Sequence, residues 1–257
     1  MTSRRIPFSP ARIVVAELSR GSRRVPRCLM SARISVAAAQ TAREAGPAPR
    51  IPWTAIFAKA WGIAARRDPV LRRFHASLPW PHLLEVDEPA ACIVVEREHG
   101  GEAAVFFARF RAPDRTPLPD IATRLRRAKA EPGHDAVRRT LRLARIPWPL
   151  RPLALRLAMA LARPLWRHAG HVAISALGAQ RVAIQDSISV LPLFLSYGPI
   201  APDGGVELYL SFDHRVMNGA DGARAIGAIA AAIEGEVATE LRALGFARGT
   251  ATLHAAG

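Results

Sequence analysis

The sequence predicts an α/β fold, a two-layer sandwich in which helices flank a mixed β-sheet. Runs rich in β-branched and aromatic residues alternate with segments of helical periodicity. Two of the runs are separated by Glu98-His99-Gly100-Gly101, a sequence typical of a hairpin turn. No Gly/Ser-rich or Pro-rich linker divides the 257 residues. The strand candidates are 30–36, 90–96, 103–110, 171–176, 190–197 and 206–212.

Four segments are predicted to be helical. The clearest spans 53–66, because Pro52 introduces it and apolar residues recur at helical spacing. The other three are 37–46, 118–130 and 220–234. We expect one domain over 1–257, with 1–24 as an N-terminal extension and 248–257 as a flexible tail.

Composition narrows the classes of function. The first 24 residues lack the apolar core of a signal peptide, and no run approaches the ~20 apolar residues that span a bilayer. Cys28 and Cys92 have no CxxC spacing, which fits a cytoplasmic protein.

The net charge is +15, and 34 of the 36 basic residues are arginine, which favours an anionic ligand, an acidic protein or an anionic membrane as partner. Nucleic acid is disfavoured because the arginines are scattered and no recognition motif accompanies them.

The segment 136–185 contains no acidic residue and interleaves arginines with Trp148, Trp166 and leucines. One interpretation is an amphipathic helix that faces a membrane or a partner. The other is a helix packed on the sheet with its arginines in solvent.

The segment with the clearest chemistry is 213–224, DHRVMNGADGAR, which places His214 where a strand ends and a helix begins. It is similar to the DHRxxxDG signature of dihydrolipoyl acyltransferases, the acyl-transferring subunits of 2-oxo-acid dehydrogenase complexes. Chloramphenicol acetyltransferase and peptide-synthetase condensation domains share its HxxxDG core. A second segment, GHVAISALG at 170–178, resembles the same family's strand G-x-F-T-I-[ST]-x-x-G.

The resemblance implies a chloramphenicol acetyltransferase-like fold and acyl transfer between coenzyme A and an acceptor. His214 would be the general base and Ser175 the hydroxyl that hydrogen-bonds the oxyanion. A positioned imidazole can take a proton from an acceptor near neutral pH, and a fixed donor stabilises the negative charge that then develops. The resemblance also implies a homotrimer, with His214 of one subunit facing Ser175 of its neighbour. No covalent acyl-enzyme and no metal are required.

Three features depart from that family. Asn218 stands where most members carry aspartate, although some carry asparagine. Ser175 and His214 lie 39 residues apart, fewer than expected. No lipoyl domain fits in the sequence, and neither Lys59 nor Lys129 has a lipoyl-attachment context, so no bound lipoyl group is expected. The acceptor stays open between the thiol of a carrier or lipoyl protein, an alcohol, an amine and a lipid.

Two other functions stay open. A non-catalytic trimeric scaffold would keep the fold without turnover. A lipid acyltransferase would contact the membrane peripherally through 138–167. His168 and His171 lie near Ser175 in the sequence, and we expect them to be solvated or to lie at the edge of the core, since no metal-ligand spacing includes them.

Overall fold

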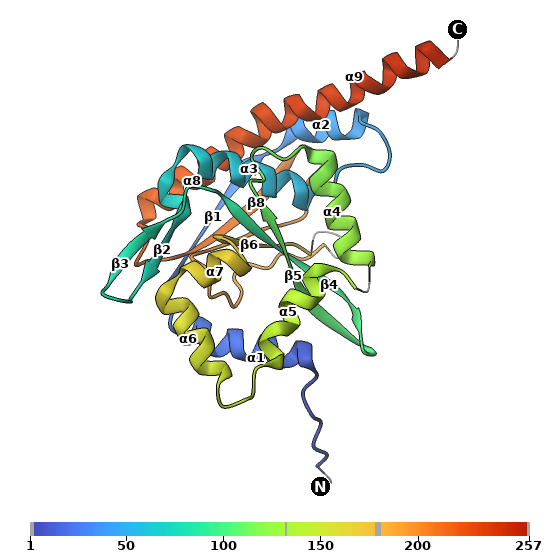
Figure 1. Cartoon of the computed structure of the whole chain (residues 1–257). Coiled ribbons are helices and arrows are strands. Elements are labelled where there is room, and N and C mark those ends of the chain that lie inside the picture. Colours follow the sequence, from blue (N-terminus) through green and yellow to red (C-terminus); the bar gives the residue numbers. More distant parts are fainter. Residues whose placement is uncertain (1–2, 132, 178–180, 256–257) are drawn as a thin grey trace.

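Six strands form one mixed sheet in the computed structural model, in the order β1-β8-β7-β6-β4-β5 (Figure 1). The structure describes residues 3–131, 133–177 and 181–255, with side chains up to residue 246. The strands are β1 (Arg27–Ser35), β4 (Ala90–His99), β5 (Glu102–Arg111), β6 (Val172–Ser175), β7 (Leu193–Tyr197) and β8 (Gly205–Asp213). β6 runs parallel to β4 and β7, and the other neighbours are antiparallel. The predicted mixed sheet and the hairpin between β4 and β5 are confirmed.

Helices cover one face of the sheet and bury most of the core there. They are α2 (Ala37–Ala45), α3 (Trp53–Arg67), α4 (Leu118–Ala130), α8 (Gly219–Ala232) and α9 (Ala238–Ala255), with a π-helical turn (Ile233–Val237) before α9. In α3 the periodic apolar residues bring Phe57 and Trp61 to complete burial. Burying a side chain of this size contributes roughly 1.5–3 kcal/mol, so α3 is a main support of the sheet.

A second group of helices lies on the opposite face (Figure 1). They are α1 (Pro10–Ser22), α5 (Asp135–Arg145), α6 (Arg151–Leu161) and α7 (Arg163–His168). Three of them, α5, α6 and α7, come from the basic segment, for which one of the two interpretations was a helix packed on the sheet. Prolines at 147, 149, 152 and 164 divide the basic segment into short helices, because proline is tolerated in a first helical turn and breaks a helix interior. α1 packs against α5 and α6, so part of the expected N-terminal extension belongs to the folded body.

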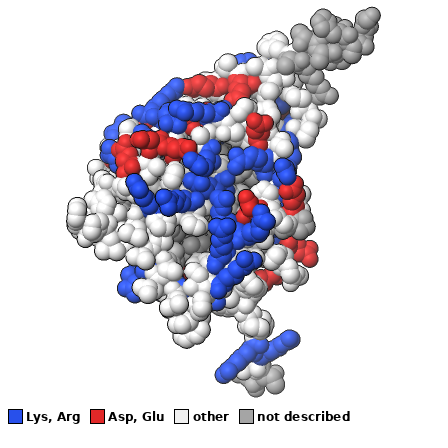
Figure 2. All heavy atoms as spheres, in the orientation of Figure 1, with Lys and Arg blue, Asp and Glu red and all other residues white. Residues whose placement is uncertain are grey.

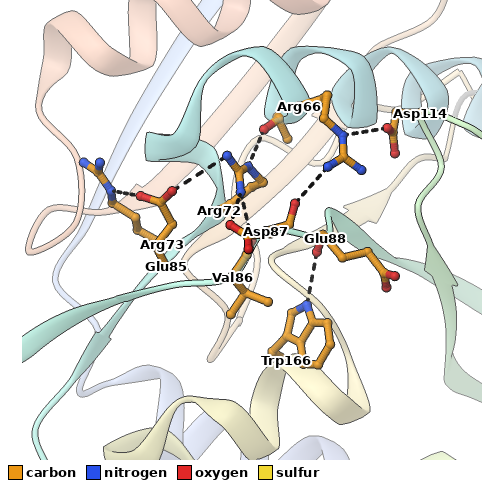
Figure 3. A network of polar contacts seen from close by, with 10 residues as sticks. Arg66, Arg72, Arg73, Glu85, Val86, Asp87, Glu88, Asp114 and Trp166 are labelled. Carbon is orange, nitrogen blue, oxygen red and sulfur yellow. Dashed lines mark hydrogen bonds and ion pairs between the residues drawn. The ribbon is translucent and has the colours of Figure 1, made fainter.

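Two short strands, β2 (Arg73–Ala76) and β3 (His82–Glu85), form a separate hairpin that the sequence did not predict. Arg72, in the 3₁₀ turn Pro69–Arg72 before it, is 7% exposed. Its guanidinium donates to the carbonyls of Ala65 and Val86 and forms ion pairs with Glu85 and Asp87 (Figure 3). Since Ala65 belongs to α3 and Glu85 to β3, this buried arginine joins the hairpin to α3. Its hydrogen bonds and ion pairs compensate its positive charge.

The chain ends differently from the prediction. α9 continues to Ala255, so the expected flexible tail is helical for most of its length. Within the described ranges, no helix is long and apolar enough to cross a membrane.

Candidate active site

His214 lies directly after β8, in the loop that leads into α8. Its backbone N–H donates to the carbonyl of Pro26 at 2.8 Å, which fixes the loop to the start of β1. The imidazole is exposed, and its ring centre lies 5.9 Å from that of Phe212, which is buried. A rigid sheet therefore presents this histidine to solvent.

The acidic residues around His214 support the loop. Asp213 is 4% exposed, and its carboxylate accepts hydrogen bonds from the backbone N–H and the guanidinium of Arg215. Asn218 is the N-cap of α8, and its backbone N–H donates to Asp221 at 2.8 Å. The contacts that the structure gives for both carboxylates are with arginines and backbone N–H groups. Both carboxylates therefore hold the loop in place.

A cavity of about 410 Å³ adjoins this loop. Asp213 and Arg215 line it, together with Arg24, His75 and Arg156. Burial, helped by the positive charge of Arg215, lowers the pKa of His75. The cavity thus combines three arginines with one aspartate, which suits an anionic ligand.

His214 follows the end of β8, whereas Ser175 lies level with the middle of that strand. Ser175 is opposite Ser196 of β7, which is opposite Tyr209 of β8, five residues before His214. With about 3.3 Å per residue along a strand and about 4.8 Å between strands, the two sites are roughly 19 Å apart. One chain therefore does not bring Ser175 and His214 together.

Ser175 is half-buried and lines a second, larger cavity on the face covered by α1, α5 and α6. Gly178, the last residue of the motif that predicted this serine, lies outside the described residues.

The neighbouring histidines differ from each other. His168 is exposed. His171 is fully buried against Phe74 and Trp61, and its Nδ1 accepts a hydrogen bond from the N–H of Ala90. Burial lowers the pKa of His171 to about 3, so it is neutral at physiological pH and belongs to the core.

The described residues offer neither a reactive thiol at Cys92 nor a metal centre. Cys92 is buried, and burial raises the pKa of its thiol to about 12, which makes it a core residue rather than a nucleophile. Among the described residues, no group of three or more histidine, cysteine, aspartate or glutamate side chains could hold a metal ion.

Sequence reasoning missed the residues that line the cavity beside His214. His75 comes from the unpredicted hairpin, Arg24 from the segment after α1, and Arg156 from α6. No local pattern connects these distant positions, so only the folded chain reveals them.

The chain was compared with known proteins. No protein-family model matches the sequence, and no curated protein matches it. A solved structure of a probable dihydrolipoamide acetyltransferase from Listeria monocytogenes is 17% identical and covers 90% of this chain and 94% of its own, with a TM-score of 0.64. The dihydrolipoamide acetyltransferase of Azotobacter vinelandii is 16% identical, covers 91% and 92%, and has a TM-score of 0.64.

A truncated catalytic core of the 2-oxoacid dehydrogenase complex from Thermoplasma acidophilum is also similar. It is 15% identical and covers 91% of this chain and 99% of its own, with a TM-score of 0.63. The chain has the fold of these acetyltransferase cores. At such low identity the likeness establishes the fold, and the activity must be argued from the site.

Proposed function

We propose that this protein is a coenzyme A-dependent acyltransferase, which moves an acyl group between coenzyme A and a thiol, hydroxyl or amine acceptor. His214 supports this proposal, since it is exposed on a fixed loop beside a basic cavity suited to the phosphates of coenzyme A. In the dihydrolipoamide acetyltransferase of Azotobacter vinelandii a serine, a histidine and an asparagine have roles in the catalytic mechanism, and the last two lie four positions apart. His214 and Asn218 have the same spacing.

In the proposed reaction His214 removes the proton from the acceptor as the acceptor attacks the thioester carbonyl. The new bond forms, and the carbonyl oxygen becomes an oxyanion that accepts a hydrogen bond from Ser175. When the intermediate collapses, the carbon–sulfur bond breaks and the proton passes from His214 to the leaving thiolate. Asn218 holds the loop as the N-cap of α8.

The separation of roughly 19 Å that ideal strand geometry gives between Ser175 and His214 favours a site shared between copies of the chain. Proton transfer and oxyanion binding both act within hydrogen-bond distance of one acyl carbon. The two residues must therefore come from different copies of the chain. A homotrimer is the proposed assembly, since a closed ring pairs each His214 with one Ser175 and leaves no surface unmatched.

The test is the consumption of acetyl-coenzyme A and hexadecanoyl-coenzyme A thioesters in the presence of a thiol, an alcohol or an amine acceptor, with light scattering on the same sample. We expect turnover with at least one acceptor class by an oligomer. A stable oligomer that turns over none of the three would contradict the proposal and leave the scaffold as the function.

A further inference from the structure

A large apolar cavity lies between the sheet and the helices α1, α5 and α6. Its volume is about 720 Å³, and most of its wall is aliphatic or aromatic. The wall includes Val14, Leu18, Phe107, Leu143, Leu155 and Phe194. Protein interiors are normally close-packed, and a space of this size and lining is typical of a small-molecule site.

The space exists because small side chains face it where larger ones would fill it. Ala154 and Ala158 of α6 line the cavity, and Ala173 lines it from β6. On the same helix Leu155 also lines the cavity, whereas Leu153 and Leu157 are 63% and 49% exposed and directed to solvent. The small alanine side chains leave the cavity open, and two leucines of the same helix are exposed to solvent.

The charged groups of the cavity are mostly basic. Arg139 and Arg142 of α5 line it, and so do Lys129 and Glu96. Figure 2 shows basic side chains gathered over the middle of the face it presents. The suitable ligand thus combines an apolar chain with an anionic group.

A further guanidinium lies beside this basic wall. Arg109 is opposite Cys92 in the pairing of β4 with β5, and Cys92 lines the cavity. Two nitrogen atoms of Arg109, Nε and Nη2, are buried without a hydrogen-bond partner among the described residues. Its guanidinium lies over the ring of Trp166, 5.0 Å from the ring centre, and its positive charge adds to that of the basic wall.

The cavity is also connected to the proposed chemistry. The hydroxyl-bearing residue Ser175 is part of its wall. Leu165 and Val190 line both this cavity and the smaller one beside the His214 loop. An acyl group whose carbonyl oxygen meets Ser175 therefore has an apolar space next to it for the rest of its chain.

From these observations we propose that the cavity binds the hydrocarbon chain of a medium- to long-chain acyl substrate. If a methylene group occupies about the volume share of a water molecule, ~30 Å³, a volume of 720 Å³ corresponds to about 24 such groups, which is enough for a chain of about 16 carbons. That the bound hydrocarbon chain belongs to a substrate rests on the proposed function, whereas the binding of such a chain in the cavity does not.

The experiment measures binding of a fluorescent fatty acid, cis-parinaric acid, to the full chain. We expect saturable binding that hexadecanoate displaces and butanoate does not. Ala158→Phe, which fills the cavity, should weaken binding at least tenfold, and Ala154→Phe provides a second filled cavity should the first variant not fold. Leu157→Phe adds a ring on the exposed side of the same helix and should bind like the wild type. Melting curves identify the folded variants.

Three outcomes would overturn the inference: no saturable binding, equal displacement by butanoate, or unchanged affinity in a folded filled-cavity variant. The first is also the result expected if residues of another copy occupy the cavity. Turnover of acetyl-coenzyme A without fatty-acid binding would reject the cavity inference alone. Fatty-acid binding that the filled-cavity variants lose, without any acyl transfer, would support the cavity and reject the proposed function.

Discussion

Asp213 and Arg215, on either side of His214, form a two-pronged ion pair. Nε of Arg215 donates to one carboxylate oxygen of Asp213 at 2.9 Å, and Nη2 donates to the other at 2.7 Å. The backbone carbonyl of Asp213 also accepts hydrogen bonds from the N–H groups of Val216 and Met217. The histidine between them is therefore held in place by its neighbours in the sequence.

We expect Asp213→Asn to loosen this loop. An amide cannot accept both guanidinium hydrogen bonds, and losing hydrogen bonds to a charged group costs about 1–3 kcal/mol of unfolding free energy. Displacement of His214 should lower kcat about 10–100-fold with a smaller change in KM. Urea unfolding and thioester consumption measure the two effects. Asp203→Asn, which removes an exposed partner of Arg33, is the control and should change neither. Unchanged kcat in Asp213→Asn would show that the pair does not position the histidine.

Replacing His214 tests the general base. His214→Ala should lower turnover about 10²–10⁴-fold, because the acceptor loses the group that removes its proton. The melting temperature and the oligomer should be unchanged, since the side chain is exposed. His168→Ala removes another exposed histidine and should keep full activity. A folded His214→Ala protein within about tenfold of wild-type turnover would rule out the role of general base.

Ser175→Ala is expected to act on the chemical step. The hydroxyl is needed chiefly when negative charge develops, and losing one oxyanion donor costs roughly 10²–10³ in kcat. Coenzyme A affinity, measured by calorimetry, should change little. If affinity fell sharply at unchanged kcat, Ser175 would be a binding residue instead.

A mixture of the two inactive variants tests whether the site is shared between subunits. When His214→Ala and Ser175→Ala proteins exchange subunits, some interfaces pair an intact histidine with an intact serine, and part of the activity should return. We expect light scattering to give a trimer of about 83 kDa, three times the 27.8 kDa chain. Demonstrated exchange without any return of activity, or an active monomer, would refute the shared site.

The buried His171 predicts how stability depends on pH. Its pKa is about 3 in the folded protein and 6.5 in the unfolded chain, so the unfolded chain binds more protons between these values. The free energy of unfolding should therefore fall as the pH drops from about 6.5 toward 3, by up to about 1.4 kcal/mol per pH unit. His171→Gln should flatten this dependence in urea titrations at a series of pH values. His168→Gln should retain it, and an equal slope in both variants would disprove the assignment.

Local patterns predicted the elements whose signals are strong. The hairpin of β4 and β5 follows from a Gly-Gly turn between apolar runs, and α3 follows from a proline start and helical spacing. The hairpin of β2 and β3 was missed because each strand has only four residues and prolines lie between them. The hairpin is held by tertiary contacts of Arg72, and the local propensities of its residues do not predict such contacts.

The sequence by itself determined the mixed sheet and the candidates His214, Ser175 and Asn218, because these depend on local periodicity and on short motifs. The tertiary structure decided where those residues lie relative to one another. Strand order and register set Ser175 two strands away from β8 and level with its middle, while His214 follows its end, and register is a property of paired strands rather than of either strand alone. The cavities were likewise decided only by the fold, because an empty space depends on side chains that meet from distant segments.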